Sequence, residues 1–273
     1  MPAITITEGT TWAIAAVATG GVIARPWRLP EAIWAVLGAA SLVVLALVPW
    51  REALNAVGRG TDVYLFLAGM MLLAELARQQ GLFDWLAAMA VKRARGSADR
   101  LFALVFGVGT AVTIFLSNDA TAVVLTPAVY AAAKAAKAQP LPYLFVCAFI
   151  ANAASFALPI SNPANLVVFG RHMPSLPSWL AQFALPSVLS IGATYIVLRL
   201  TQRASLRQPI AKDVDVPPLS RAGRLTACGI GVAALLLMAA SAVDIRLGWP
   251  TFLAGIDGLR RVIRPAASAL GHA

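Results

Sequence analysis

Long apolar segments repeat along this chain, and polar residues or prolines interrupt several of them. Charged residues make up only 12% of the 273 residues, and hydrophobic residues make up 59%. Soluble domains carry about 25% charged residues. A helix needs about 20 mostly apolar residues to cross the hydrocarbon core of a bilayer. The repeated segments therefore predict an all-α membrane protein, folded as a polytopic helical bundle.

The apolar runs predict membrane helices along most of the chain. Expected spans lie at about 12–24, 32–49, 63–76, 101–116, 120–133, 144–158, 179–198 and 225–243. The run at 82–91 is too short to span and ends in basic residues. We interpret it as an amphipathic helix at the membrane interface, and a short buried helix is the alternative. A last run at 251–256 stops at Asp257, which predicts a chain that ends inside an element, as a truncation would leave it.

Lysine and arginine outnumber the acidic residues by 22 to 12, which gives a formal net charge of +10. In a soluble protein this excess would suggest a nucleic-acid partner. Here the basic residues lie between the apolar runs, as the positive-inside rule produces, so we expect no nucleic acid. The basic stretches 92–100 and 199–224 are expected on the cytoplasmic side of a bacterial-type cytoplasmic (inner) membrane that the chain crosses several times.

A first polar interruption, Ser117-Asn118-Asp119, falls between two apolar runs. A carboxylate at bilayer depth costs about 2.5–3.5 kcal/mol on insertion scales, and such residues generally line a cavity or an ion path. These residue types also cap helix N-termini, where free N–H groups attract polar or anionic solutes. The hypothesis is a solute site. The alternative is that Asp119 only caps a buried helix or pairs with a cation elsewhere in the bundle.

A second interruption, Pro159-Ile160-Ser161-Asn162-Pro163-Ala164-Asn165, contains two prolines that disfavour helix. Irregular backbone at membrane depth persists only where protein or a water-filled cavity satisfies it. Two such breaks therefore indicate one shared site, although a simple kink is the alternative. Neither break contains Lys or Arg. Amides, hydroxyls, backbone and one carboxylate suit a neutral hydroxylated solute or a cation.

Motifs for catalysis are missing from the sequence. It contains no phosphate-binding loop, no cluster of metal ligands and no catalytic triad, and its two cysteines, Cys147 and Cys228, lie far apart. We therefore expect no enzyme, no cofactor and no metal site.

The segments at 116–127 and 159–170 resemble the arsenite efflux permease family, which belongs to the ion transporter superfamily together with the sodium-coupled dicarboxylate carriers. The likeness covers most of 61–200. Ser-Asn-Asp-Ala-Thr, followed by an apolar run and Thr-Pro, is similar to the tip of that superfamily's first re-entrant hairpin. The stretch Ser161-Asn162-Pro163-Ala164-Asn165 is similar to the unwound part of the next, discontinuous helix.

This resemblance implies one half of an inverted-repeat transporter. Residues 1–200 would form the first repeat, with scaffold spans, a hairpin at about 101–135, a broken helix at about 143–170 and a span at 179–198. Residues 201–224 would form a cytoplasmic linker, and residues 225–273 the truncated start of the second repeat. In the superfamily, the hairpin tip and the unwound stretch form one ion or substrate site. The residues that match it are Ser117, Asn118, Asp119, Thr121, Ser161, Asn162 and Asn165.

The resemblance also implies a function, which is export of arsenite or antimonite coupled to protons or to an ATPase partner. Asp119 stands where sodium-coupled members tend to have Thr, which favours the arsenite branch. Expected partners are a small inorganic solute such as arsenite, membrane lipid, an ATPase subunit and a second copy of the chain. Two alternatives stay open: a sodium-coupled carrier of carboxylates or sulfate, and an inactive truncated membrane subunit.

Overall fold

The computed structural model describes residues 6–169, 173–212, 216, 218–243 and 245–258. Within these residues all regular elements are helical, and the sole β-type pairing is an isolated bridge between Ser97 and Pro209. The predicted all-α fold class is confirmed. The chain divides into two compact units, residues 1–61 and 62–273.

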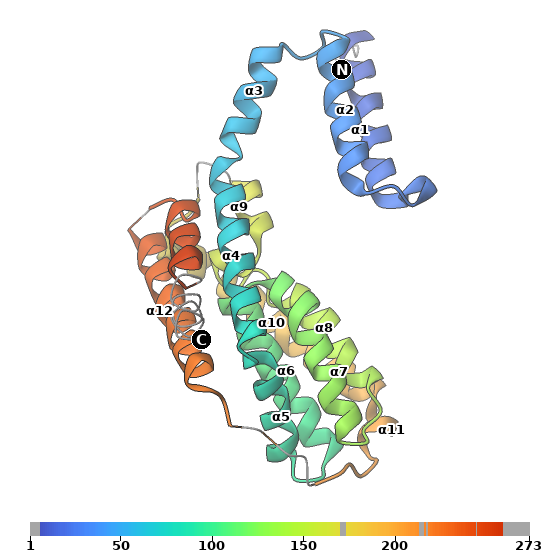
Figure 1. The fold of residues 1–273 in the computed structure, drawn as a ribbon. Helices are drawn as coiled ribbons and strands as arrows, with labels where there is room; N and C mark the ends of the chain where they lie inside the picture. The colour runs from blue at the N-terminus through green and yellow to red at the C-terminus, as the bar shows by residue number, and fades with distance from the viewer. Residues whose placement is uncertain (1–5, 170–172, 213–215, 217, 244, 259–273) are drawn as a thin grey trace, which may run out of the picture. The chain divides into compact units, whose positions relative to one another are not determined.

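The first unit consists of α1 (Ile6–Ala24), the short η1 (Pro26–Arg28), α2 (Glu31–Val44) and α3 (Trp50–Arg59). Helices α1 and α2 pack side by side (Figure 1). Gly21 permits this close approach, because a Cβ atom there would overlap the ring of Trp34. Arg25 forms an ion pair with Glu31 across the turn. These two helices correspond to the first two expected spans, although α2 ends at Val44 rather than near residue 49.

The second unit holds the remaining elements. They are α4 (Thr61–Gln79), α5 (Leu82–Ala94), α6 (Ala98–Phe115), the π-helical η2 (Ala120–Leu125), α7 (Thr126–Ala135), α8 (Leu141–Ala153), η3 (Pro159–Ser161), α9 (Pro163–Phe169), α10 (Leu176–Thr201), α11 (Arg203–Leu206), α12 (Arg221–Ala242) and a helix over 248–258. Over the described residues of both units, four stretches are long and apolar enough to cross a membrane: Trp50–Gln79, which contains α3 and α4, Ala98–Phe115, Leu176–Thr201 and Arg221–Ala242.

Helix α5 buries one face in the second unit, where it packs against α6 and α7. Its buried residues include Phe83, Ala87 and Val91, none more than 2% exposed. Alanine on this face lets the neighbouring helices approach closely. The short helix predicted at 82–91 is present and exposes Asp84, Lys92 and Arg93 on its other face, and its position relative to the membrane interface remains a prediction.

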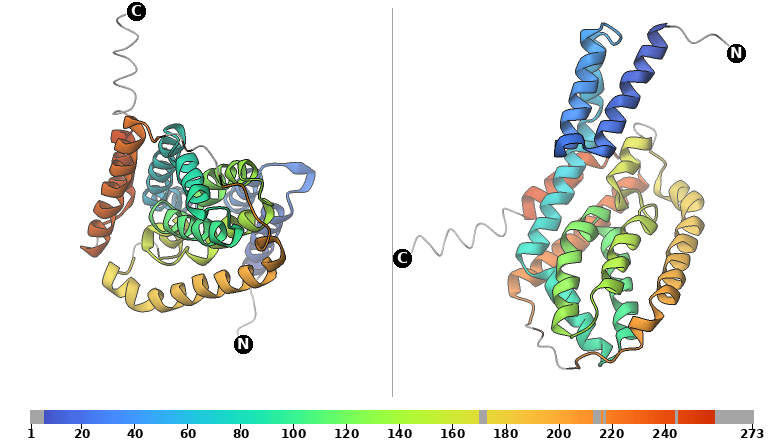
Figure 2. Two further views of the ribbon diagram at one scale, coloured as in Figure 1. Left: turned by 90° about the horizontal axis from the view of Figure 1, so that it is seen from below. Right: turned by 90° about the vertical axis from the view of Figure 1, so that its right-hand side faces the viewer.

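Helices α6 and α7 are the two arms of a helical hairpin (Figures 1 and 2), and its re-entrant insertion into the membrane remains a prediction. The segment at 209–211 ties the open end of the hairpin together. There, the Ile210 N–H donates to the Gly96 carbonyl at 3.2 Å, and the Ala211 N–H donates to the Ala136 carbonyl at 2.8 Å. Because α6 begins and α7 ends at this edge, both arms lead to the same tip at residues 116–119.

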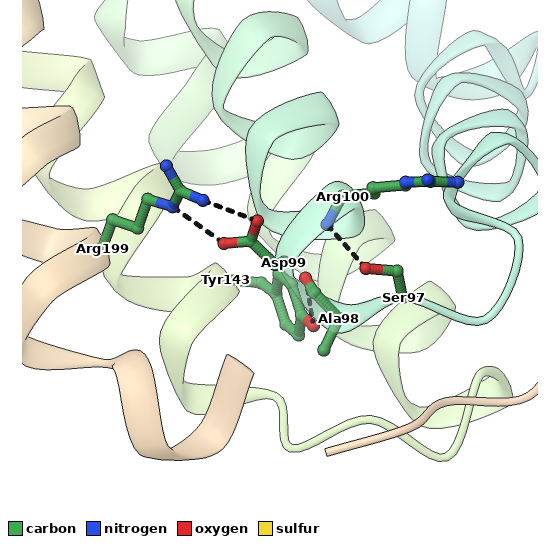
Figure 3. A network of polar contacts seen from close by, with 6 residues as sticks. All are labelled: Ser97, Ala98, Asp99, Arg100, Tyr143 and Arg199. Atoms are coloured by element: carbon green, nitrogen blue, oxygen red, sulfur yellow. Dashed lines mark hydrogen bonds and ion pairs between the residues drawn. The ribbon is translucent and has the colours of Figure 1, made fainter. Parts of the chain in front are cut away.

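Helix α8 starts at the same edge and then breaks. The Tyr143 hydroxyl, in the first turn of α8, donates to the Ala98 carbonyl at the start of α6, at 3.3 Å (Figure 3). Helix α8 ends at Ala153, and α-helix resumes only at Pro163 in α9. The helix is therefore discontinuous between Ala153 and Pro163, and the bounds of about 143–170 as one element of a transporter repeat remain a prediction.

The helix over 248–258 packs tightly on α4 through glycines. A Cβ atom on Gly255 would lie 2.9 Å from the Gly69 carbonyl oxygen, and one on Gly69 would overlap the backbone of Thr251. Small residues at such crossings are typical of helix pairs in membranes. The predicted tail at 259–273 lies outside the described residues, and the predicted boundaries after residues 200 and 224 remain predictions.

Candidate functional site

The hairpin tip turns at Ser117, whose φ of 130° lies in a region that residues with a side chain rarely adopt. The Ser117 side chain is buried, and its Oγ accepts a hydrogen bond from the Ala120 N–H at 3.4 Å. The capping role expected of this motif therefore falls on Ser117. Asp119 makes no side-chain cap bond, and its side chain is exposed in this chain.

Below the tip, two threonines join the arms of the hairpin. The hydroxyl oxygens of Thr113 and Thr121 lie 2.8 Å apart, and both residues are fully buried. The arm then widens into the π-helical η2, where the Thr126 hydroxyl donates to the Thr121 carbonyl at 2.9 Å. Pro127 supplies no N–H for a regular helical bond in this turn. Short π segments inside helices are frequent at functional sites.

The break between α8 and α9 satisfies its backbone with its own polar side chains. Ser161 Oγ accepts from the Leu158 N–H at 3.0 Å, and Asn162 Oδ1 accepts from the Ala164 N–H at 2.9 Å. Asn165 Nδ2 donates to the Ser155 carbonyl at 3.1 Å. Non-helical backbone at membrane depth requires such partners.

Ser161 also links the break to the hairpin, because its Oγ donates to the Ile114 carbonyl at 3.0 Å. The structure thus places the second polar interruption against the last turn of α6, three residues before Ser117. The seven predicted site residues are not equally placed. Ser117, Thr121, Ser161 and Asn165 are buried, Asn118 and Asn162 are partly buried, and Asp119 is exposed. Their role in binding remains a prediction.

Two buried amide oxygens in this region accept no hydrogen bond from the described part of the chain. They are Asn118 Oδ1 at the hairpin tip and Asn165 Oδ1 at the start of α9. Buried polar atoms normally have a partner, so unpaired acceptors call for an explanation. An amide oxygen can accept from the hydroxyl groups of a solute or coordinate a cation.

Sequence reasoning missed two residues that support this site. Thr113 sits in an uninterrupted apolar run, so nothing marked it before the structure brought it to Thr121. Trp179, at the start of α10, is fully buried, and its indole N–H donates to the Phe156 carbonyl in the break at 3.0 Å. Trp179 is the first residue of the apolar run at 179–198, a position typical of a tryptophan at the membrane interface. Nothing in the sequence therefore indicated its hydrogen bond to the break.

Known proteins match most of the chain. The citrate transporter family (CitMHS) matches residues 14–266. The arsenical pump membrane protein of Escherichia coli is 28% identical over 204 residues, which cover 69% of this chain and 46% of that protein. An uncharacterised transporter of Mycobacterium tuberculosis is 29% identical over 146 residues, covering 53% of this chain and 34% of its own length. An uncharacterised transporter of Synechocystis is 24% identical over 207 residues, covering 75% and 46%. The chain thus spans only 34% to 46% of the length of these relatives.

Proposed function

Because the chain belongs to the citrate transporter (CitMHS) family, we propose that it forms one half of a secondary transporter that exports arsenite or antimonite. One observation carries the proposal. The last turn of α6, just before the hairpin tip, meets the α8–α9 break through the bond from Ser161 to the Ile114 carbonyl. A polar site buried at the meeting point of two broken elements is the arrangement that transporters use to hold a solute at mid-membrane.

The chemistry of the site suits a neutral hydroxylated solute. Arsenite in neutral water is the uncharged trihydroxide, whose O–H groups can donate to Asn118 Oδ1 and Asn165 Oδ1, the two buried acceptors without a described donor. Capture by thiolates would need several cysteines together, whereas Cys147 is buried in α8 and Cys228 is exposed on α12. The name of the E. coli relative, an arsenical pump membrane protein, supports this substrate.

A carboxylate carrier is the second candidate, favoured by the description of the matching family as citrate transporters. Citrate carries several negative charges, which proteins usually bind with guanidinium groups. The described residues of the two breaks, 116–121 and 154–165, contain no Lys or Arg. This donor set favours arsenite over citrate, and sodium-dependent uptake would favour the carboxylate carrier.

The charge distribution supports an orientation in which the open end of the hairpin faces the cytoplasm. Basic residues gather where α5, α7 and α10 end and α6 begins: Lys92, Arg93, Arg95, Arg100, Lys134, Arg199 and Arg203. The positive-inside rule assigns such an end to the cytoplasm. The hairpin then enters from the cytoplasmic side, with its tip inside the membrane. In this proposal, export is driven either by proton movement coupled through Asp119 or by ATP hydrolysis in an attached ATPase subunit.

Arsenite accumulation in arsenite-sensitive bacteria tests the proposal. The chain is expressed alone and fused to the second half of a family relative, each also as Asn165→Leu. Asn152→Leu is the matched control, since this exposed amide bonds only to the Ala148 carbonyl of its own helix. We expect cells that express the active form to accumulate less arsenite than cells without it. Asn165→Leu should abolish this reduction, and Asn152→Leu should retain it. Export by the fusion alone would mean that this chain needs a second half. No export by either, with sodium-dependent citrate uptake instead, would replace arsenite by a carboxylate.

A further inference from the structure

A polar cavity lies at the open end of the hairpin, away from the tip. This cavity of about 330 Å³ lies between the start of α6 and the corner where α10 gives way to α11. Its lining residues are Asp99, Arg199, Leu200, Arg203, Leu206 and Arg207. Three of these six residues are arginines, and one is acidic.

The one carboxylate of the cavity is already paired. Arg199 Nε and Nη2 donate to the two oxygens of Asp99, each at 2.8 Å, in a bidentate pair (Figure 3). Arg203 and Arg207 are exposed, and neither has an ion pair with any acidic group in the described part of the chain. The cavity therefore presents two unpaired guanidinium groups beside a neutralised pair, and its net character is positive.

The surface next to the cavity is apolar and exposed. On the last turns of α10, the side chains of Ile196, Val197 and Leu200 are 56%, 56% and 61% exposed. In a membrane helix, an apolar surface of this kind faces lipid acyl chains. If the acyl chains of a lipid lie along this surface of α10, the lipid headgroup lies next to Arg203 and Arg207.

We propose that this cavity binds the phosphate group of an anionic phospholipid, with Arg203 and Arg207 as the main ligands and the acyl chains along the end of α10. Guanidinium groups bind phosphate oxygens in bidentate fashion, and basic pockets between membrane helices on the cytoplasmic side bind acidic headgroups. The Asp99–Arg199 pair fixes α10 against α6 and so holds the shape of the cavity.

Native mass spectrometry of the full chain in detergent tests this site with phosphatidylglycerol as the probe and phosphatidylcholine as the neutral comparison. The variant is Arg203→Gln with Arg207→Gln. The control is Arg93→Gln with Arg100→Gln, which removes the same charge from exposed residues at the same end, outside the cavity lining. Arg100 extends to the opposite side of α6 from Arg199 (Figure 3).

We expect the Arg203 and Arg207 variant to bind phosphatidylglycerol about 30-fold more weakly, and the control to bind within about threefold of the unchanged chain. If the double variant does not purify, Arg207→Gln alone is measured, with about fivefold weaker binding expected. Competition by inorganic phosphate, lost in the same variant, would show that the cavity takes phosphate whether or not it is attached to a lipid. Equal losses in both variants, or equal binding of phosphatidylcholine, would overturn the proposal.

Discussion

Ser161 Oγ donates to the carbonyl oxygen of Ile114 at 3.0 Å and so joins two segments that lie 47 residues apart. Ile114 is in the last turn of the first hairpin arm, and Ser161 is in the break that follows α8. The same oxygen accepts from the Leu158 N–H. One hydroxyl therefore holds the irregular turn and attaches it to the hairpin.

Ser161→Ala removes both of these hydrogen bonds and leaves the buried Leu158 N–H and the partly buried Ile114 carbonyl without this partner. We expect the free energy of unfolding to fall by about 1–3 kcal/mol, the usual penalty for unsatisfied buried groups. Thermal unfolding of the purified chain in detergent measures the change. Ser178→Ala is the control, because the Ser178 hydroxyl pairs with Ser175 on an exposed surface. Equal stability of the two variants would contradict the linking role of Ser161.

The hydroxyl pair of Thr113 and Thr121 should show coupling between its members. Thr113→Val leaves the buried Thr121 hydroxyl without a hydrogen-bond partner. When both threonines are replaced by valine, no buried hydroxyl of this pair is left unpaired. We expect about 1–2 kcal/mol of destabilisation for either single change and less than their sum for the double change. Denaturant unfolding of the three variants checks this. Thr110→Val is the control, since Thr110 bonds only within its own helix, to Phe106; strict additivity would argue against the pair.

Gly69→Ala tests the packing of the helix over 248–258 on α4. The added methyl group would overlap the backbone of Thr251, so the two helices must separate. The probe is Thr251→Cys in a Cys228→Ser background, because Thr251 is fully buried. With Gly69→Ala, this thiol should react about tenfold faster with a thiol reagent. A loss of about 1.4 kcal/mol of packing free energy raises the population of the open state by a factor of about ten. Gly107→Ala, where an added Cβ meets nothing within 4 Å, should leave the rate unchanged. Equal rates in both variants would contradict the close crossing.

Asp119→Asn should separate function from stability. The Asp119 side chain is exposed at the hairpin tip and makes no cap bond, so unfolding should change by less than about 0.5 kcal/mol, as for most surface substitutions. If Asp119 carries the coupled proton, its amide variant should lose the pH dependence of arsenite export in inverted vesicles. An unchanged pH profile would remove Asp119 from the coupling mechanism.

Helix α5 shows where the sequence was insufficient. The shortness of the 82–91 run and its basic end are local properties, which the sequence shows directly. Burial of Phe83 and Ala87 arises from contact with α6 and α7, whose positions depend on the hairpin. A local pattern cannot distinguish a helix covered by neighbouring helices from one that lies at a lipid interface.

The same division applies to the site. Its polar residues were found from the sequence because Ser, Asn, Asp and Pro stand out in apolar surroundings. Their burial could not be found in this way: Asn165 faces the interior, whereas Asp119, the residue that carries the charge, is exposed. Thr113 and Trp179 were missed because their roles depend entirely on partners, Thr121 and the Phe156 carbonyl, that only the fold supplies.

By itself, the sequence determined the helical membrane class and the positions of both breaks, since scarce charge, apolar run length and proline act locally on the chain. Tertiary structure alone decided that Ser161 reaches Ile114, that the two threonines meet, and that Arg199 pairs with Asp99 beside two unpaired arginines. These contacts join residues across helices, so they follow from how the hairpin and the broken helix pack against each other and not from any property of one segment.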